Sequence, residues 1–224
     1  MIDAVLGVVA PHICKGCEAS GSTLCDSCFF DIIDDMYAVC IACESIVGVG
    51  NLCRKCTELS QLDRAFVVGE RRDALKRLIG DFKFNSERAS AKVIASLLDA
   101  RLPYFSQQTT IIPIPTIAPH VRQRGFDHTK LIAKHLSKLR KWPIETNVLL
   151  RKTDSVQHKS SANKRIEQAE KAFEINPRKS IPKQILLLDD IYTTGATVSA
   201  AAKLLRNSGA THIDLGIIAR QISK

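Results

Sequence analysis

The hydrophobic positions of residues 61–224 predict strands and helices that alternate along the chain. In Ile185–Leu188 four apolar residues stand side by side without polar alternation, which is typical of a strand buried on both faces of a parallel sheet. In Asp73–Phe84, by contrast, apolar residues recur at the spacing of one helix face. The same patterns predict strands at Leu62–Gly69, Thr109–Ile114, Glu145–Leu150 and His212–Ile218, and helices at Ala89–Leu102, Thr129–Leu139, Ala162–Phe173 and Thr197–Arg206. Because strands alternate with helices, we expect an α/β fold, a parallel sheet with helices on both faces.

Charge and cysteine content divide the chain into two parts. Residues 1–60 carry 3 Lys and Arg against 8 Asp and Glu, a net charge of −5, and contain all 8 cysteines. Residues 61–224 carry 29 against 15, a net charge of +14. The sequence therefore predicts a small Cys-rich domain over residues 1–60 and a larger basic domain over residues 61–224.

The cysteines form four Cys-x-x-Cys pairs, and each such pair lets two thiolates bind one face of a tetrahedral metal ion. The pairs are Cys14/Cys17, Cys25/Cys28, Cys40/Cys43 and Cys53/Cys56. Disulfides fit less well because no secretory leader is evident, and a thioredoxin-like redox pair needs a βαβ setting. We expect two structural zinc ions with four thiolates each, in a double zinc ribbon. The spacing favours sequential pairing and leaves interleaved pairing open.

The segment Ile185–Thr197 carries the most informative chemistry of the chain. A buried strand leads into two adjacent carboxylates, Asp189 and Asp190, then into a Thr- and Gly-rich loop before a helix. Open α/β sheets bind ligands at the carboxyl ends of their strands. Hydroxyls and backbone N–H groups of the loop can surround a phosphate at the positive end of the helix, and the residues are Thr193, Thr194, Gly195, Ala196 and Thr197. Because carboxylates repel phosphate, we expect the acidic pair to face neutral hydroxyls or a metal ion.

These thirteen residues resemble the phosphoribosyl-pyrophosphate (PRPP) signature of type I phosphoribosyltransferases. The chain departs from it at Tyr192, where most members carry an aliphatic residue. The resemblance implies a type I phosphoribosyltransferase-like fold with Asp189 and Asp190 as catalytic residues that hold the ribose hydroxyls. It also implies that the Thr193–Thr197 loop surrounds the 5′-phosphate and that Mg²⁺ binds together with PRPP.

Further segments narrow the resemblance. With the cysteine pairs, Ile112–Pro115 and Arg122–Phe126 are similar to the ComF (ComFC) family of competence-associated proteins, over nearly the whole chain. The chain departs from that family at Asp127 and His128, where Asn and Gln are usual. The resemblance implies a mobile lid over residues 153–168. It also implies a group of residues for the departing pyrophosphate: Lys83, Ile114, Arg122, Arg124, Arg151, Lys152 and Arg165.

Two functions from different classes fit these features. One is a Mg²⁺-dependent phosphoribosyltransferase with an unknown acceptor, and the other is a catalytically inactive nucleic-acid-binding module that keeps the transferase fold. A net charge of +14 fits a basic surface that only keeps the protein solvated, and it also fits polyanionic partners. We expect DNA, single- or double-stranded, beside PRPP. The family resemblance implies a role in DNA uptake during natural transformation and partners among other competence proteins, such as a helicase.

The location of the protein follows from its apolar segments. No apolar run reaches the roughly 18 residues that a membrane span needs. The first ten residues are apolar but carry Asp3 and no preceding basic segment, unlike a secretory signal. We therefore expect a cytoplasmic protein without a membrane span.

Overall fold

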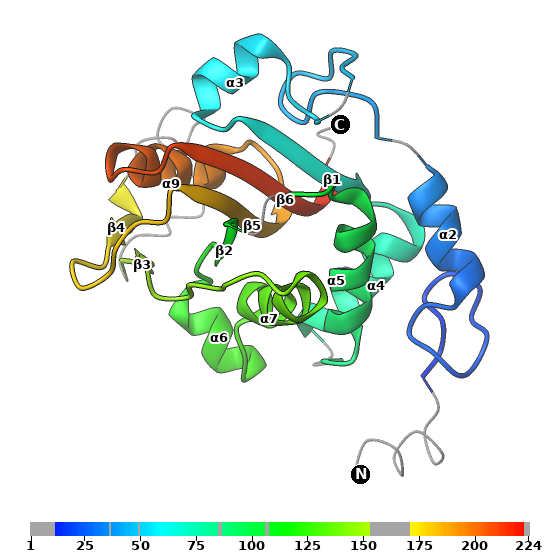
Figure 1. Ribbon diagram of the computed structural model, residues 1–224. Coiled ribbons are helices and arrows are strands. Elements are labelled where there is room, and N and C mark those ends of the chain that lie inside the picture. Colours follow the sequence, from blue (N-terminus) through cyan, green and yellow to red (C-terminus); the bar gives the residue numbers. More distant parts are fainter. Residues whose placement is uncertain are drawn as a thin grey trace.

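A four-stranded parallel sheet forms the centre of the protein in the computed structural model (Figure 1). The structure describes residues 12–35, 37–48, 50–84, 87–105, 108–152 and 171–221. The strands are β1 (Arg64–Glu70), β2 (Thr110–Pro113), β5 (Gln184–Tyr192) and β6 (His212–Arg220), in the order β1-β6-β5-β2. Every neighbouring pair is parallel, which confirms the predicted sheet.

Helices cover both faces of this sheet. On one face lie α4 (Asp73–Phe84), α5 (Ser90–Arg101) and α7 (His128–Arg140), and on the other lies α9 (Ala196–Asn207). Successive strand residues point to opposite faces: Leu186 and Leu188 pack with α4, α5 and α7, whereas Ile185 and Leu187 pack with α9. Two-sided burial explains why Ile185–Leu188 shows no polar alternation.

Two predicted elements of the body are wrong in part. The predicted strand Glu145–Leu150 forms only at its end, as β3 (Leu149–Arg151), and it pairs antiparallel with β4 (Phe173–Ile175) in a separate two-stranded sheet. Phe173 therefore begins a strand instead of ending a helix, and residues 162–170 of that predicted helix lie outside the described residues. The short helix α6 (Ala118–Arg124) was not predicted because none of its residues is buried, so it has no apolar periodicity.

The Cys-rich segment contains two helices, α2 (Asp26–Asp34) and α3 (Arg54–Ser60), and packs closely on the body. Cys14, Leu24 and Cys28 share a hydrophobic core with α4 and α5. Ile41, which lies between Cys40 and Cys43, belongs to the core on the α9 face and is fully buried. The two halves of the Cys-rich segment thus contact opposite faces of the sheet.

The helices of the structure are short. The longest in the described part of the chain, α7, has 13 residues, whereas crossing a bilayer takes about 20. Across the described ranges, no helix is long and apolar enough to span a membrane.

Candidate functional site

β5 is longer than its neighbour β2, and the difference opens one edge of the sheet. β2 pairs with β5 as far as Pro113, opposite Leu188, while β5 continues to Tyr192 because β6 supplies its partners on the other side. Asp189 and Asp190 therefore lie just beyond the last residue that β2 covers. The predicted strand ended at Leu188; the structure extends it through the acidic pair.

A cavity of about 340 Å³, here called the β5 cavity, lies at this edge. The fold brings together the segment that follows β2 and residues from α4, α6, α7, β3, β5 and α9, which are distant in the sequence. The predicted site residues that line it are Lys83, Ile114, Arg124, Arg151, Asp189, Asp190 and Thr197. Basic and acidic groups are thus combined in one cavity, as a ligand with both phosphates and hydroxyls requires.

Asp190 is buried and is held by two side chains. Lys83, in the last turn of α4, forms an ion pair with its carboxylate, and Nε2 of His128 contacts the same oxygen. Arg124 lies 3.0 Å from Nδ1 of His128, and because a guanidinium can only donate, Nδ1 accepts and Nε2 carries the proton that Asp190 accepts. Although burial raises it, the hydrogen bond from His128 and the charge of Lys83 hold the pKa of Asp190 well below its usual value.

Asp189 has a different environment, although it is the next residue. Its Oδ1 accepts a hydrogen bond from the backbone N–H of Asp190, at 2.9 Å. Burial and the neighbouring charge of Asp190 raise the pKa of Asp189 to about 7, against the weaker opposing charges of Lys83 and Arg151. The pair therefore consists of one carboxylate that stays ionised and one that titrates near neutral pH.

The sequence did not identify His128 as a site residue. An isolated histidine in a polar stretch is commonly exposed, but this one is 6% exposed and lies against Asp190. The residue before it, Asp127, caps α7, since its Oδ1 accepts from the backbone N–H of Lys130 and from the hydroxyls of Thr116 and Thr129. An Asp directly before an amphipathic helix is a capping signal that could have placed His128 at a helix start.

A second cavity of about 380 Å³ adjoins the first, because Pro115, Thr116, Ile117 and Arg151 line both. The predicted site residues Arg122 and Lys152 line this neighbouring cavity. Arg165 and the predicted lid over residues 153–168 fall outside the described residues.

The loop between β5 and α9 has the predicted strand–loop–helix order. Thr193 and Thr194 are exposed, and Gly195 has a φ of 75° in the left-handed region, directly before the first turn of α9. Tyr192 is 6% exposed, and its burial, with the nearby thiols of Cys40 and Cys56, raises its pKa to about 12. Thr193, Thr194, Gly195 and Ala196 stand outside the two cavities, whereas Thr197 lines the β5 cavity.

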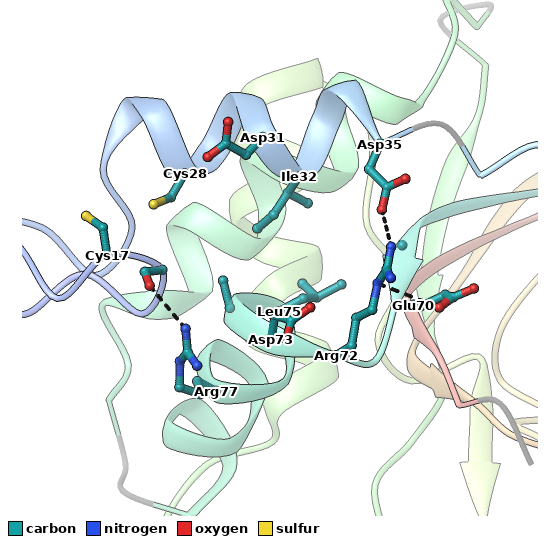
Figure 2. A pocket seen from close by; sticks show the side chains of 13 residues that line it. Cys17, Cys28, Asp31, Ile32, Asp35, Glu70, Arg72, Asp73, Leu75 and Arg77 are labelled. Atoms are coloured by element: carbon teal, nitrogen blue, oxygen red, sulfur yellow. Dashed lines mark hydrogen bonds and ion pairs between the residues drawn. The ribbon is translucent and has the colours of Figure 1, made fainter. Parts of the chain in front are cut away.

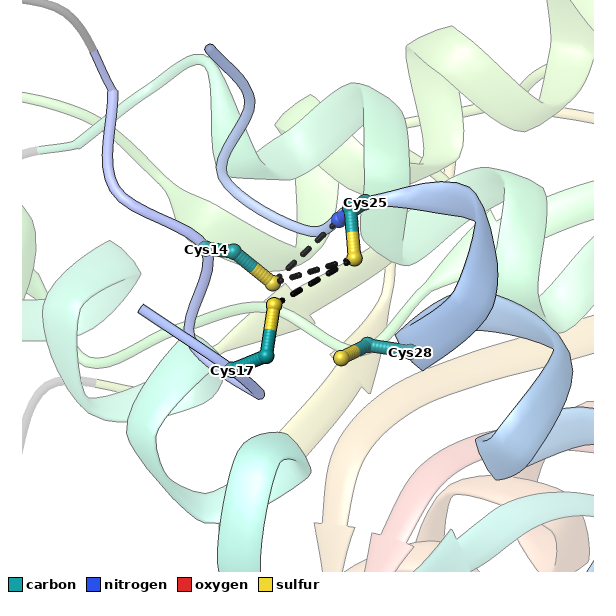
Figure 3. A group of neighbouring side chains, drawn as sticks. All are labelled: Cys14, Cys17, Cys25 and Cys28. Carbon is teal, nitrogen blue, oxygen red and sulfur yellow. Dashed lines mark hydrogen bonds between the residues drawn. The ribbon is translucent and has the colours of Figure 1, made fainter. Parts of the chain in front are cut away.

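The eight cysteines form two groups, which settles the pairing as sequential. The first cysteine cluster is Cys14, Cys17, Cys25 and Cys28, and the second is Cys40, Cys43, Cys53 and Cys56. Within each group all sulfur atoms lie within 4.8 Å of one another. In the first cluster the four side chains point toward a common centre (Figure 3).

The sulfur geometry fits Zn²⁺. Cys14 and Cys25, Cys17 and Cys25, and Cys43 and Cys53 have Sγ–Sγ distances of 3.6 Å. A tetrahedron with Zn–S bonds of about 2.3 Å has edges of about 3.8 Å. Four thiolates and no open coordination position define a structural zinc site.

The electrostatics of the thiols agree with this assignment. Burial opposes the Cys14 thiolate, but backbone N–H groups of Cys25, Cys17 and Gly16 donate to it, and together they lower its pKa to about 6. At Cys28, burial and the neighbouring thiols raise the pKa to about 12. Four thiolates therefore need a cation to form together, and a divalent metal supplies it.

Beside the first cysteine cluster, a cavity of about 510 Å³ separates α2 from the start of α4 (Figure 2). Arg72 crosses its far end and pairs with Asp35 at 2.7 Å and with Glu70 at 3.7 Å. On the cluster side, Arg77 donates to the carbonyl oxygen of Gly16 at 3.1 Å. These contacts join the Cys-rich segment to the body across the cavity.

Known proteins with similar sequences take part in competence or DNA use. The chain is 32% identical to competence protein ComFC of Streptococcus pneumoniae, over 62% of this chain and 60% of that protein. It is 31% identical to competence protein F of Haemophilus influenzae, over 70% of this chain and 73% of that one. It is also 27% identical to the DNA utilization protein YhgH of Escherichia coli strain K12, over 71% and 73%. No protein-family model matches the chain.

Proposed function

Because the chain belongs to the ComF family of competence proteins, we propose that it binds PRPP in the β5 cavity and acts in DNA uptake during natural transformation. One observation carries the PRPP proposal: two adjacent carboxylates, Asp189 and Asp190, share a cavity with Arg124 and Arg151. Carboxylates suit the ribose hydroxyls of PRPP, and guanidinium groups suit its phosphates. The fold that we propose is accordingly that of a type I phosphoribosyltransferase.

The two carboxylates would divide the recognition of ribose between them. Asp190, ionised and held by Lys83 and His128, has a constant orientation and accepts a hydrogen bond from one hydroxyl. Asp189, with a pKa of about 7, accepts from the other hydroxyl more strongly as the pH rises through neutrality. The 5′-phosphate would bind the backbone N–H groups and hydroxyls of the Thr193–Thr197 loop at the start of α9.

The pyrophosphate of PRPP would lie toward the neighbouring cavity. Arg151 lines both cavities, and Arg122 and Lys152 line the second, so basic side chains continue away from the acidic pair. In a transfer reaction the bond from ribose C1 to pyrophosphate breaks, a bond from C1 to the acceptor forms, and the acceptor loses its proton. The cations stabilise the charge that develops on the departing pyrophosphate.

Mg²⁺ would accompany the ligand. Hard oxygen ligands suit it, and among the described residues of the β5 cavity Asp189 is the carboxylate that no Lys or His side chain contacts. When bound, the ion neutralises pyrophosphate charge. Asp189 is therefore the residue of this chain that we assign to it.

Calorimetric titration tests the proposal. The zinc-loaded protein is titrated with PRPP and Mg²⁺ beside an Asp189→Asn/Asp190→Asn variant. Asp34→Asn/Asp35→Asn is the matched control, because it removes an adjacent and exposed carboxylate pair at the C-terminal end of α2, outside the β5 cavity. We expect micromolar binding to the wild type and to the control, and at least a hundredfold weaker binding to the site variant. Equal affinity in all three, or no heat with any, would contradict the proposal.

A second function, direct DNA binding, is favoured by the net charge of +14 on residues 61–224. It predicts binding that falls steeply with salt concentration and that the Asp189→Asn/Asp190→Asn variant retains. Fluorescence anisotropy with a labelled oligonucleotide measures the affinity of the wild type and of the variant. Titrations at about 50 and about 200 mM salt give the salt dependence. Binding without salt dependence would argue against phosphate contacts.

A further inference from the structure

The ring of Tyr192 supports the turn of the Thr193–Thr197 loop. A Cβ atom built on Gly195 would lie 2.2 Å from the phenolic oxygen of Tyr192 and 2.6 Å from Cζ. The ring therefore occupies the space directly beside the Gly195 backbone, at the point where φ is 75°. The path of the loop into α9 depends on where this ring lies.

On its other side, Tyr192 is connected to the second cysteine cluster through a shared hydrophobic core and through Arg220. Ile41, between the ligands Cys40 and Cys43, is buried in the same hydrophobic core as Tyr192. Arg220 pairs with Tyr192 in the register of β5 and β6, and it donates at 2.7 Å to Glu44, the residue after Cys43. The backbone N–H of Gln221 donates to the carbonyl oxygen of Tyr192 at 2.8 Å.

From these contacts we propose that Tyr192 is a positioning residue through which the second cysteine cluster sets the conformation of the Thr193–Thr197 loop. With metal bound, the Cys40–Cys43 turn is held in place, and with it Ile41 and Glu44. Loss of a ligand frees that turn, so the ring of Tyr192 gains room and Gly195 loses its support. The loop must then lose conformational entropy before its N–H groups can bind an anion, which weakens anion binding.

The first cysteine cluster has no such connection among the described residues. Its turn contacts α4, where Lys15 pairs with Asp81 at 2.8 Å and Arg77 donates to the carbonyl oxygen of Lys15 at 2.6 Å. Its buried members pack on the face of the sheet opposite to Tyr192. Cys17 and Cys43 hold equivalent places in the two clusters and are both exposed, so their substitution forms a matched pair.

The first test is hydrogen exchange of the full-length, zinc-loaded protein measured by mass spectrometry. Cys43→Ser should increase exchange about tenfold in peptides that cover residues 193–200, corresponding to about 1.4 kcal/mol of local stability. Cys17→Ser should leave those peptides unchanged. Equal exchange of residues 193–200 in both variants would overturn the proposal.

The second test asks whether the effect passes through the tyrosine. Tyr192→Val removes the ring, so Cys43→Ser added to it should no longer change exchange in residues 193–200. A full additional increase in the double variant would show that Tyr192 does not transmit the effect. Glu44→Gln keeps all four thiols and weakens the contact with Arg220, so it should reproduce a smaller part of the increase and serves if Cys43→Ser fails to fold.

Ligand affinity connects this inference to the proposed function, on which its anion-binding part rests. PRPP with Mg²⁺ should bind about tenfold more weakly to Cys43→Ser and less than threefold more weakly to Cys17→Ser. A wild-type protein that binds no PRPP would contradict the proposed function, and the exchange measurements would then decide the coupling by themselves. An unchanged affinity in Cys43→Ser would overturn the coupling even if PRPP binds.

Discussion

The two cysteine clusters have the same order of pairs and the same pattern of exposure, yet they contact different halves of the molecule. The first packs with α4 and α5 on one face of the sheet, and charged side chains reinforce the contact. The second packs with α9 and the end of β6 on the other face. One metal-binding motif is thus used twice to support opposite sides of a single sheet.

The difference teaches how the clusters relate to the β5 cavity. The helix that the first cluster contacts, α4, carries in its last turn Lys83, which pairs with Asp190. The second cluster lies behind Tyr192 and the loop that ends in Thr197. The clusters therefore lie behind two different walls of one cavity, and we expect each wall to be disturbed separately.

Removal of a buried ligand from either cluster has the largest expected effect. Cys14→Ser and Cys40→Ser should each reduce the zinc content by one ion per chain, because each cluster binds its metal alone. The melting temperature should fall by roughly 10 °C, the shift expected for about 4 kcal/mol in a chain of this size. Metal analysis and calorimetry measure the two effects. A variant that loses both zinc ions would break the comparison, since it would mean that the clusters depend on each other.

Asp190→Asn disturbs the wall that the first cluster supports. Because Lys83 is largely buried against this carboxylate, the substitution leaves a cation without its partner and should lower the free energy of unfolding by about 3 kcal/mol. Urea denaturation measures the change. Lys83→Met/Asp190→Asn is the control, and it should recover part of the loss because the unpaired charge is gone. A double variant less stable than Asp190→Asn would contradict the ion-pair account.

Gly16→Ala tests the packing inside the first cluster. A Cβ atom at Gly16 would lie 2.3 Å from Sγ of Cys28, so either the sulfur or the turn must move. We expect a loss of about 2 kcal/mol, within the range for overpacking of a buried site. Gly48→Ala, near the second cluster, is the control, because nothing lies within 4 Å of a Cβ atom there. Thermal unfolding that ranks the two variants in the opposite order would argue against the packing described.

Asp189→Asn should stabilise the protein, and only at high pH. The pKa of Asp189 is raised from 3.8 to about 7 on folding, so the folded chain keeps a proton that the unfolded chain has released. The free energy of unfolding therefore falls as the pH rises from 3.8 to about 7, and the full destabilisation is present above pH 7. The variant should melt a few degrees above the wild type at about pH 8 and at the same temperature at about pH 4. A constant difference at both pH values would contradict the raised pKa.

Lys15→Gln should have the smallest effect. Lys15 pairs with Asp81 at 2.8 Å and with Glu87 at 3.3 Å, on a partly exposed surface between the first cluster and α4. Its loss should cost about 1 kcal/mol or less, and less again at high salt. Arg54→Gln, which removes an exposed pair with Glu58 beside the second cluster, should cost nearly nothing. Urea denaturation at two salt concentrations compares the two variants. Equal losses in the free energy of unfolding would mean that the Lys15 ion pairs do not stabilise the contact between the first cluster and α4.

Local patterns in the sequence determined much of this protein. The run Ile185–Leu188 predicted a strand buried on both faces, because a residue that is apolar on each side must be covered on each side. The order of residues from Ile185 to Thr197 predicted a strand, a loop and a helix start in succession. The spacing of the cysteines predicted two four-thiol sites, because a Cys-x-x-Cys turn imposes its geometry within four residues.

Tertiary structure decided what depends on contacts between distant segments. β5 extends to Tyr192 because β6 supplies its hydrogen-bond partners. His128 is buried because α7 lies against the end of β5, where Asp190 accepts a hydrogen bond from its Nε2–H. The two clusters lie on opposite faces of the sheet because Cys28 packs in one hydrophobic core and Ile41 packs in the other. Periodicity and spacing act over a few residues of chain, whereas burial and ion pairing are set by whichever segments the fold brings together.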